Sequence, residues 1–318
     1  MAEKQDLYYE SRDGKTRIHG VIWKPDCMLG EQPAKPKCVL QIVHGMEEYI
    51  DRYDEFARFL NKYDICVIGN DHLGHGQSVS DEVVHGYFGM DDIATVVVRD
   101  VHRLKKMVQE TLPEVPFFIM GHSMGSFLVR QYLCCHGTEL SGAVICGTGY
   151  QPEAVLKAAL ALCRVEAALR GWKSRSHLLQ WMTFGSFNSK FAPNRTQSDW
   201  LCRNEEIVDA YESDPKCGFL FTLNGYYNLF LTMYKVIRRE YLERMPRELP
   251  VLFISGEKDP VGGFGKGVRT VEKLFRETGM RSVECRLYPE DRHELLNEVD
   301  RQEVYEDILD WIKQNGLL

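Results

Sequence analysis

One serine of this chain lies in a pattern that favours a nucleophile. The segment Gly121-His122-Ser123-Met124-Gly125 follows the apolar run Phe117–Met120 and precedes a helical pattern. In a strand–turn–helix context, a G-x-S-x-G motif exposes its serine hydroxyl on a tight turn. The glycines two positions before and after the serine let the strand and the helix pack closely. We therefore interpret Ser123 as a candidate nucleophile.

A serine hydroxyl is a poor nucleophile at neutral pH and needs a histidine base oriented by a carboxylate. Reactive groups of an open parallel sheet collect beyond the carboxyl ends of its strands. The candidates are therefore residues that directly follow strand-like runs. Val251–Ile254 leads into Asp259, and Val283–Leu287 leads into His293. The sequence predicts Asp259 and His293 as the partners of Ser123.

Other carboxylates and histidines compete for these two roles. Glu257 comes earlier on its turn than Asp259, and Glu290 and Asp291 are too close in sequence to His293 to reach across it easily. Of the other histidines, His122 flanks the serine but is expected to point away from the reacting groups. The rest are interpreted as turn residues, which are His72 and His75, or as surface residues, which are His19, His85, His102, His136 and His177.

Acyl transfer also needs hydrogen-bond donors for the oxyanion, each contributing about 3–4 kcal/mol in measured cases. The backbone amide of Met124, directly after the nucleophile, is one expected donor. The second should come from the loop after the apolar run Cys38–Val43, which reads His44-Gly45-Met46. We predict that the amide of Met46 is this second donor.

The elements around these residues indicate an α/β fold with a mostly parallel sheet of about eight strands flanked by helices. Apolar runs alternate with helical patterns from residue 38 onward, as in strand–helix–strand units. Before them, Leu7–Ser11 and Thr16–Trp23 flank the turn dipeptide Asp13-Gly14, which predicts an antiparallel start. The predicted parallel strands are Cys38–Val43, Ile65–Gly69, Phe117–Met120, Ala143–Cys146, Val251–Ile254 and Val283–Leu287.

Amphipathic helices are expected between these strands. One contains Ile93 to Val108 at helical spacing and has Asp91 or Asp92 at its start; the others run from Ser123 to Cys135, from near Gly267 to Gly279, and through Val304, Ile308 and Trp311.

One long interval breaks the alternation. Residues 151–235 contain no convincing strand and are helical and rich in aromatic side chains. Eighty-five residues are too many for a loop inside a compact domain. We predict a helical cap over 151–235, inserted into a core formed by residues 1–150 and 236–318.

The composition of the chain indicates which classes of binding partner and which cellular compartment to expect. The net charge of −7 and the absence of a dense Lys/Arg cluster make nucleic acid an unexpected partner. Ten cysteines without a CxxC pair are interpreted as free thiols, and no secretion signal is seen at the N-terminus, so a cytoplasmic protein is expected. The charge-free stretch between Lys216 and Lys235 is broken by glycines and asparagines and is not predicted to span a membrane, although peripheral membrane contact through the cap stays open.

Taken together, the motifs resemble those of α/β-hydrolases of the serine aminopeptidase and monoacylglycerol lipase-like group, which includes bacterial lysophospholipases. The resemblance covers nearly the whole chain and implies the triad Ser123, Asp259 and His293, an oxyanion hole from Met46 and Met124, and a helical lid. The matching pieces are His44-Gly45 with Glu48 and Arg52-Tyr53, Asp71-His72 with Gly74-His75-Gly76 and Ser78, the turn at Ser123, Gly256 with Asp259, and Tyr288-Pro289 with Arg292-His293-Glu294. This chain differs from many relatives at the mouth of the site, where Glu47 replaces a second glycine, Tyr49 a histidine and Leu73 an arginine.

The resulting hypothesis is a serine carboxylic-ester hydrolase that acts through an acyl-enzyme on monoacylglycerol, lysophospholipid or similar medium-chain acyl esters. An aminopeptidase or amidase, with a carboxylate such as Glu47 or Glu48 holding the substrate ammonium, is one alternative. A non-catalytic ligand-binding protein of the same fold is another. No metal and no organic cofactor are predicted. Aromatic side chains of the cap are expected to line the acyl pocket, foremost Phe184, Phe187, Phe221 and Tyr226.

Overall fold

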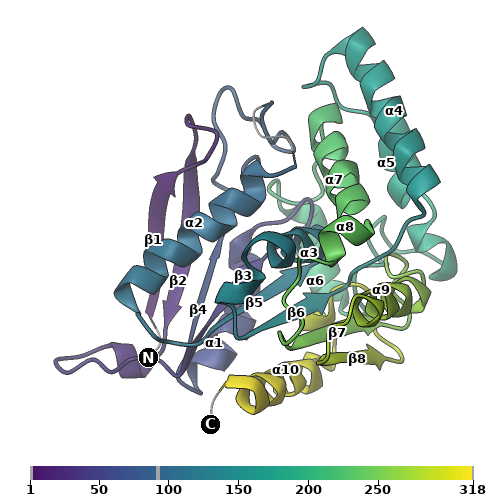
Figure 1. Ribbon diagram of the computed structural model, residues 1–318. Helices are drawn as coiled ribbons and strands as arrows, with labels where there is room; N and C mark the ends of the chain where they lie inside the picture. Colours follow the sequence, from purple (N-terminus) through teal and green to yellow (C-terminus); the bar gives the residue numbers. More distant parts are fainter. Residues whose placement is uncertain (1–2, 91–93, 317–318) are drawn as a thin grey trace.

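The protein is built around one twisted sheet of eight strands. The computed structural model describes residues 3–90 and 94–316, and Figure 1 shows the sheet running through the centre of the molecule. The strand order is β1-β2-β4-β3-β5-β6-β7-β8. The strands are β1 (Glu3–Glu10), β2 (Arg17–Lys24), β3 (Cys38–Val43), β4 (Ile65–Asn70), β5 (Phe117–His122), β6 (Gly142–Cys146), β7 (Val251–Gly256) and β8 (Val283–Tyr288).

Strand pairing follows the sequence-based expectation. Strand β2 pairs antiparallel with both β1 and β4, and all pairs from β4 to β8 are parallel. Every residue of β3 to β7 is buried, which explains their continuous apolar runs. The predicted α/β class is confirmed, and the carboxyl ends of β3, β5, β7 and β8 lie at the same edge of the sheet.

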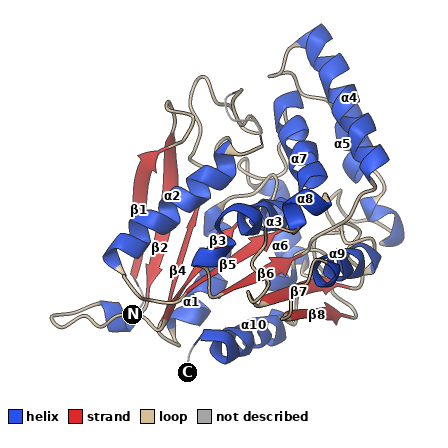
Figure 2. Ribbon diagram, viewed as in Figure 1, coloured by secondary structure: helices blue, strands red, loops and turns tan. Residues whose placement is uncertain are grey.

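Helices cover both faces of the sheet, as Figure 2 shows. Alternate strand residues point to opposite faces. On one face, Val39 and Ile119 pack with three helices: α2 (Val96–Thr111), α3 (Met124–His136) and α9 (Lys266–Glu277). On the other face, Leu40 and Phe118 pack with α1 (Asp54–Asn61) and α10 (Arg301–Gly316). The predicted start of the helix that precedes β5, at Asp91 or Asp92 with Ile93, lies outside the described residues. The described loops also contain five short 3₁₀ helices: η1 (Asp26–Met28), η2 (Ile50–Tyr53), η3 (Gly137–Glu139), η4 (Phe187–Lys190) and η5 (Leu295–Asn297).

Between β6 and β7 the chain leaves the sheet and forms a group of helices, which stands at the upper right of Figure 1. Its two long helices, α4 and α7, pack along each other. An isolated β-bridge joins Arg175 to Thr222. The helices are α4 (Glu153–Arg170), α5 (His177–Phe184), α6 (Glu205–Ser213), α7 (Leu223–Lys235) and α8 (Arg239–Leu242).

The stretch without charged residues between Lys216 and Lys235 ends in α7, a helix of 13 residues. Within residues 3–90 and 94–316, no helix combines the length and the apolar character that crossing a membrane would require.

Arg130, a buried residue of α3, forms hydrogen bonds to the chain before α4 and to the chain after α7. Its guanidinium donates to the carbonyl oxygen of Gly149 at 3.2 Å and to that of Val236 at 3.1 Å. Burial lowers the pKa of Arg130 to about 9. One core side chain therefore connects the chain just after β6 to the end of α7.

Candidate active site

Ser123 lies on the tight turn between β5 and α3. Its φ of 53° is in the left-handed region, which side chains other than glycine rarely adopt. The turn is possible because its neighbours have no side chains: a Cβ on Gly121 would lie 2.3 Å from the carbonyl oxygen of Gly125, and a Cβ on Gly125 would lie 1.9 Å from that of Val43. These contacts are the steric reason for the spacing seen in the sequence.

Asp259 and His293 come together beyond the ends of β7 and β8. Asp259 Oδ1 lies 3.0 Å from His293 Nδ1, although the ring N–H is not aligned with this oxygen. Both side chains are buried. The carboxylate of Asp259 accepts hydrogen bonds from the amide of Val261 at 2.8 Å and from Ser255 Oγ at 3.2 Å, which fix its orientation.

The competing carboxylates are engaged elsewhere or face solvent. Glu257 and Glu290 are exposed, and Asp291 forms an ion pair with Arg203. Ser123 and His293 line the same cavity, with no direct hydrogen bond between them in the described structure. Gly147 leaves room for the imidazole, because a Cβ there would lie 3.1 Å from His293 Cε1. Unliganded sites often have such open geometry and tighten when substrate binds.

The loop after β3 lies directly against the serine. A Cβ on Gly45 would lie 3.1 Å from Ser123 Cβ, so this glycine allows the close approach. Met46 and Met124 both line the wall of a cavity that Ser123 also borders. Neither methionine amide has a hydrogen-bond acceptor among the described residues. The amides are therefore free to receive an oxyanion.

A buried ion cluster connects these loops. Arg52 donates two hydrogen bonds to the carboxylate of Glu294, at 2.6 and 2.7 Å, and one to Glu48 Oε2 at 3.0 Å. Glu48 Oε1 accepts from the amide of Gly45, from Tyr53 at 2.9 Å and from His122 Nδ1 at 3.2 Å. The oxyanion loop, the serine turn and the histidine loop are thus held by one set of charges.

His122 has a role that the sequence analysis missed. Its other ring nitrogen lies 3.2 Å from the carbonyl oxygen of His293. Burial would lower the pKa of His122, but the bond to Glu48 raises it overall. Burial would raise the pKa of Glu48, but His122 and Arg52 hold it below its usual value. The adjacency of Glu294 to His293, together with the four-residue spacing of Glu48 and Arg52, is the sequence signal that could have indicated this cluster.

One histidine expected at the surface is buried. His19 is fully enclosed, with Nδ1 2.9 Å from Asp71 and Nε2 2.8 Å from Asp6. The surface interpretation was wrong because β2, which carries His19, lies between two other strands instead of at the sheet edge.

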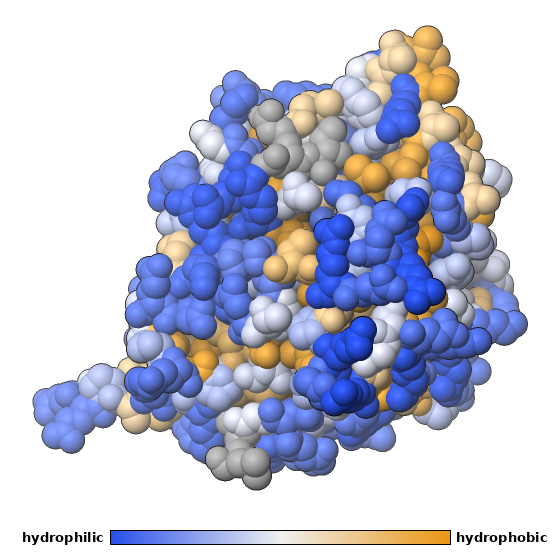
Figure 3. Space-filling model, viewed as in Figure 1, coloured by the Kyte–Doolittle hydropathy of each residue, from blue (hydrophilic) through white to orange (hydrophobic). Residues whose placement is uncertain are grey.

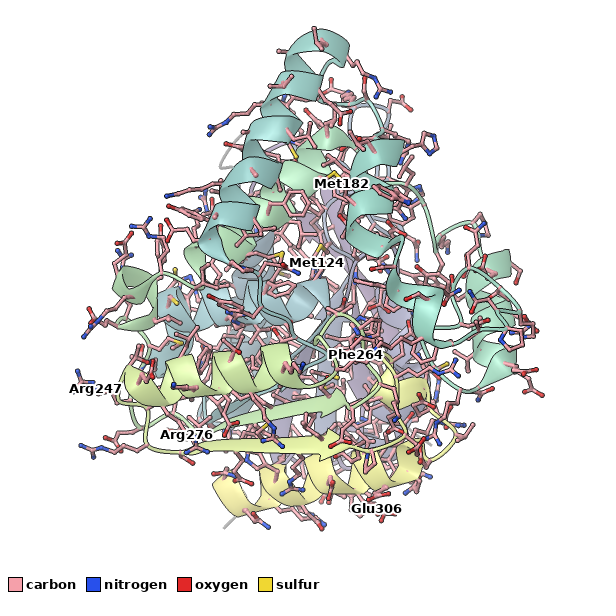
Figure 4. The ribbon with its side chains drawn as sticks, turned by 90° about the vertical axis from the view of Figure 1, so that its right-hand side faces the viewer. Met124, Met182, Arg247, Phe264, Arg276 and Glu306 are labelled. Atoms are coloured by element: carbon pink, nitrogen blue, oxygen red, sulfur yellow. The ribbon has the colours of Figure 1, made fainter. Side chains whose placement is uncertain are left out.

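Two cavities meet at Ser123. The larger one, about 740 Å³, has walls of mixed polar and apolar side chains and also contacts His293. The smaller one, about 210 Å³, has mostly apolar walls from α3, α4, α5 and α7. Figure 4 shows Met124 at the start of α3 and, above it on α5, Met182; both contribute to the smaller cavity.

The four aromatic residues expected around the substrate divide into two pairs. Phe184 and Phe187 line the smaller cavity, and Phe184 also borders the larger one. Phe221 and Tyr226 are fully buried and line neither of these cavities. Phe221 packs instead against His75, Phe88 and Tyr226. The structure does not bring this second pair to the site, because Phe221, just before α7, and Tyr226, on α7, are both packed in the core.

The sequence matches the family model described as "Serine aminopeptidase, S33" over residues 34–300. The chain is 31% identical to the monoglyceride lipase of Rattus norvegicus over 240 residues, which cover 74% of this chain and 68% of that protein. It is 24% identical to the monoacylglycerol lipase of Mycolicibacterium smegmatis, over 94% of each chain.

Solved structures are similar over the full length. A thermostable carboxyl esterase from Bacillus coagulans, in complex with glycerol, has a TM-score of 0.89 at 30% identity, covering 98% of each chain. The fold also matches a soluble variant of the monoglyceride lipase from Saccharomyces cerevisiae, with a TM-score of 0.76 at 18% identity, covering 100% of this chain and 96% of that one. The chain therefore belongs to the serine aminopeptidase S33 family of α/β-hydrolases and is a serine hydrolase that acts on ester bonds.

Proposed function

We propose that this enzyme hydrolyses single-chain acyl esters such as monoacylglycerols, with Ser123 as nucleophile, His293 as base and Asp259 as the carboxylate that orients it. The observation that carries this proposal is the position of Ser123 between a mostly apolar cavity and a larger one whose walls also carry amide, hydroxyl and carboxyl groups. An acyl glycerol has one apolar and one polar part joined at the ester. The names of the relatives, which are lipases and esterases, support the same substrate class.

In the proposed mechanism, Ser123 Oγ attacks the ester carbonyl while His293 takes its proton. Asp259 stabilises the imidazolium that forms. The amides of Met46 and Met124 donate hydrogen bonds to the oxyanion of the tetrahedral intermediate. His293 then gives the proton to the leaving alcohol, and water releases the acid from the acyl-enzyme by the reverse sequence of proton transfers.

The walls of the two cavities support an assignment of the substrate parts. Phe127, Leu156, Leu229 and Met233 make the smaller cavity suitable for the acyl chain. The larger cavity, lined by amide, hydroxyl and carboxyl groups, suits a polar alcohol. Its walls carry four glutamates and no lysine or arginine, which disfavours the phosphate of a lysophospholipid. We therefore propose monoacylglycerols ahead of lysophospholipids.

We further propose that residues 151–235 form a lid that supplies the acyl pocket and contacts lipid surfaces. Large apolar side chains on α4 and α5 are exposed, among them Leu169 (81%) and Trp181 (70%). Figure 3 shows apolar residues gathered at the upper right, over α4. Contiguous exposed apolar patches of this kind favour an interface with membrane or protein. Of the exposed apolar residues, Trp181 also lines the larger cavity and Met182 the smaller one, so part of this surface continues into the walls around Ser123.

A reducing compartment such as the cytoplasm is also proposed. All ten cysteines are free thiols, and seven of them are buried. Unpaired cysteines in this number suit a compartment that keeps thiols reduced.

Labelling with a fluorophosphonate probe tests the nucleophile. We expect a single adduct, on Ser123, and none after Ser123→Ala, because this serine combines an exposed turn with a nearby base. Ser126→Ala is the matched control, since Ser126 Oγ is committed to the carbonyl oxygen of Ser123. Mass spectrometry that located the adduct on another serine would refute the assignment.

Asp259→Asn tests the third member of the triad. We expect kcat to fall by about 10⁴-fold with the fold intact, as in a serine protease with the equivalent change, because the histidine would be held in the wrong tautomer. Glu257→Gln, on the same turn but exposed, should change kcat by less than about threefold. Circular dichroism verifies the fold; a larger loss in the Glu257 variant would reassign the carboxylate.

A series of nitrophenyl esters of increasing chain length tests the acyl pocket. Each methylene buried adds about 0.8 kcal/mol, so kcat/KM should rise about fourfold per methylene until the cavity is filled, and then fall. Phe184→Ala should move the optimum to longer chains. Phe221→Leu, outside the cavity, should lower stability without moving the optimum. An optimum at acetate in every variant would contradict a chain-binding lid.

Flotation with phosphatidylcholine vesicles tests the lipid contact. The wild type should float with the vesicles, and the double variant Leu169→Asp/Trp181→Asp should remain in the soluble fraction, because two apolar contacts are replaced by charges. Val299→Asp replaces another exposed apolar residue (58%) outside the helical segment, so it serves as the control. Equal flotation of all three proteins would argue against contact through α4 and α5.

A further inference from the structure

A buried glutamate of the larger cavity has no role in the mechanism above. Glu47 directly follows Met46, and its φ of 58° lies in the left-handed region that favours glycine. Its backbone carbonyl accepts a hydrogen bond from the amide of Gly218 at 3.1 Å. Its side chain lines the cavity that also contains Ser123 and His293. The loop therefore adopts a strained conformation in which a carboxyl group stands beside the reacting centre.

The carboxyl group of Glu47 has no hydrogen-bond donor among the described residues. The residue is only 7% exposed, and Oε1 is completely enclosed without a partner. The charge of Arg175 favours ionisation, but the two side chains form no ion pair, and burial raises the pKa of Glu47 to about 8. The other ionisable neighbours are Tyr211 and Tyr226, which offer no compensating positive charge. Leaving a buried carboxyl unpaired costs free energy that a bound partner would recover.

The walls of the cavity favour a positive partner. Its carboxyl groups come from Glu47, Glu48, Glu212 and Glu294, and no lysine or arginine lines it. Arg52 neutralises Glu48 and Glu294 from behind, whereas Glu47 forms no ion pair among the described residues and only feels the charge of Arg175 nearby. The aromatic side chains Trp181, Trp200 and Tyr211 share the same walls. A carboxylate next to aromatic faces is the environment that stabilises ammonium groups.

We propose that Glu47 binds the positively charged alcohol part of a second substrate class, the acyl esters of amino alcohols such as choline. This inference rests on the proposed function, because Ser123 would cleave these esters by the same acyl transfer. The ester C–O bond breaks, the alcohol oxygen takes the proton held by His293, and water converts the acyl-enzyme to the free acid. The ammonium lies in the larger cavity against Glu47, and the acyl chain occupies the smaller one.

Two isosteric esters test the proposal: butyrylcholine and 3,3-dimethylbutyl butyrate, which replaces the charged nitrogen by carbon. At pH 8.5, the wild type should prefer the choline ester by at least tenfold in kcat/KM. Glu47→Gln keeps the shape and removes the charge, so it should lower this ratio at least tenfold. Glu47→Gly, which also relieves the left-handed φ, should lower it equally. Glu212→Gln removes an exposed acid from the same cavity and should change the ratio less than twofold.

Binding separates this inference from the proposed function. Calorimetry on Ser123→Ala protein measures the affinity for both esters without hydrolysis, and adding Glu47→Gln should remove the preference for the choline ester. If the wild type hydrolysed neither ester but binding still depended on Glu47, the proposed function would fail, and the part of this inference that assigns ammonium binding to Glu47 would stand. If the ratios were the same with and without Glu47, while the neutral ester was hydrolysed, Glu47 would be a structural neighbour of Arg175 and this inference would fail.

Discussion

The geometry of the site depends on one buried ion cluster, formed by Glu48, Arg52 and Glu294. Arg52 donates hydrogen bonds to the carboxylates of Glu48 and Glu294, and Glu48 in turn accepts hydrogen bonds from the amide of Gly45 and from His122. Buried charges are tolerated only when they are paired and hydrogen-bonded, so none of the three loops can move without leaving a charge unpaired. The cluster lies behind the reacting groups and holds the ends of β3, β5 and β8 in a fixed relation.

The second constraint is steric and concerns the turn at Ser123. Its left-handed backbone is accepted because β5 and α3 can approach through Gly121 and Gly125, with Gly45 doing the same for the neighbouring loop. Strain concentrated at a reactive residue is typical of sites where the surrounding structure overdetermines a conformation. Here the surrounding structure is the fully buried parallel sheet, which cannot relax without losing core packing.

Many of the side chains that line the two cavities beside Ser123 come from outside the sheet. The helices between β6 and β7 provide most of the apolar walls of the smaller cavity. The larger cavity is lined by the loop after β3, by α5 with the chain that follows it to Leu201, and by the end of α6. Arg130 joins both ends of the helical segment to α3, the helix that begins beside Ser123. Changes in the helical segment can therefore alter the pocket while the reacting groups stay on the rigid sheet.

The sequence by itself determined the α/β fold, the eight strands and the placing of Ser123, Asp259 and His293 just beyond strand ends, because periodicity and turn motifs are local signals. The predicted ends of β4, β5, β7 and β8 were one or two residues early, since parallel pairing carries β5 on to His122, and β1 begins at Glu3 and not at the predicted Leu7. Only the tertiary structure decided that Arg52 meets Glu294, 242 positions away, that His19 is enclosed between two aspartates, and that Phe221 and Tyr226 face the core. The physical reason is that burial periodicity identifies which residues are inside but not which distant residues they contact. The unpaired carboxyl of Glu47 was also decided by the tertiary structure alone, because only the folded cavity shows that no described residue donates a hydrogen bond to it.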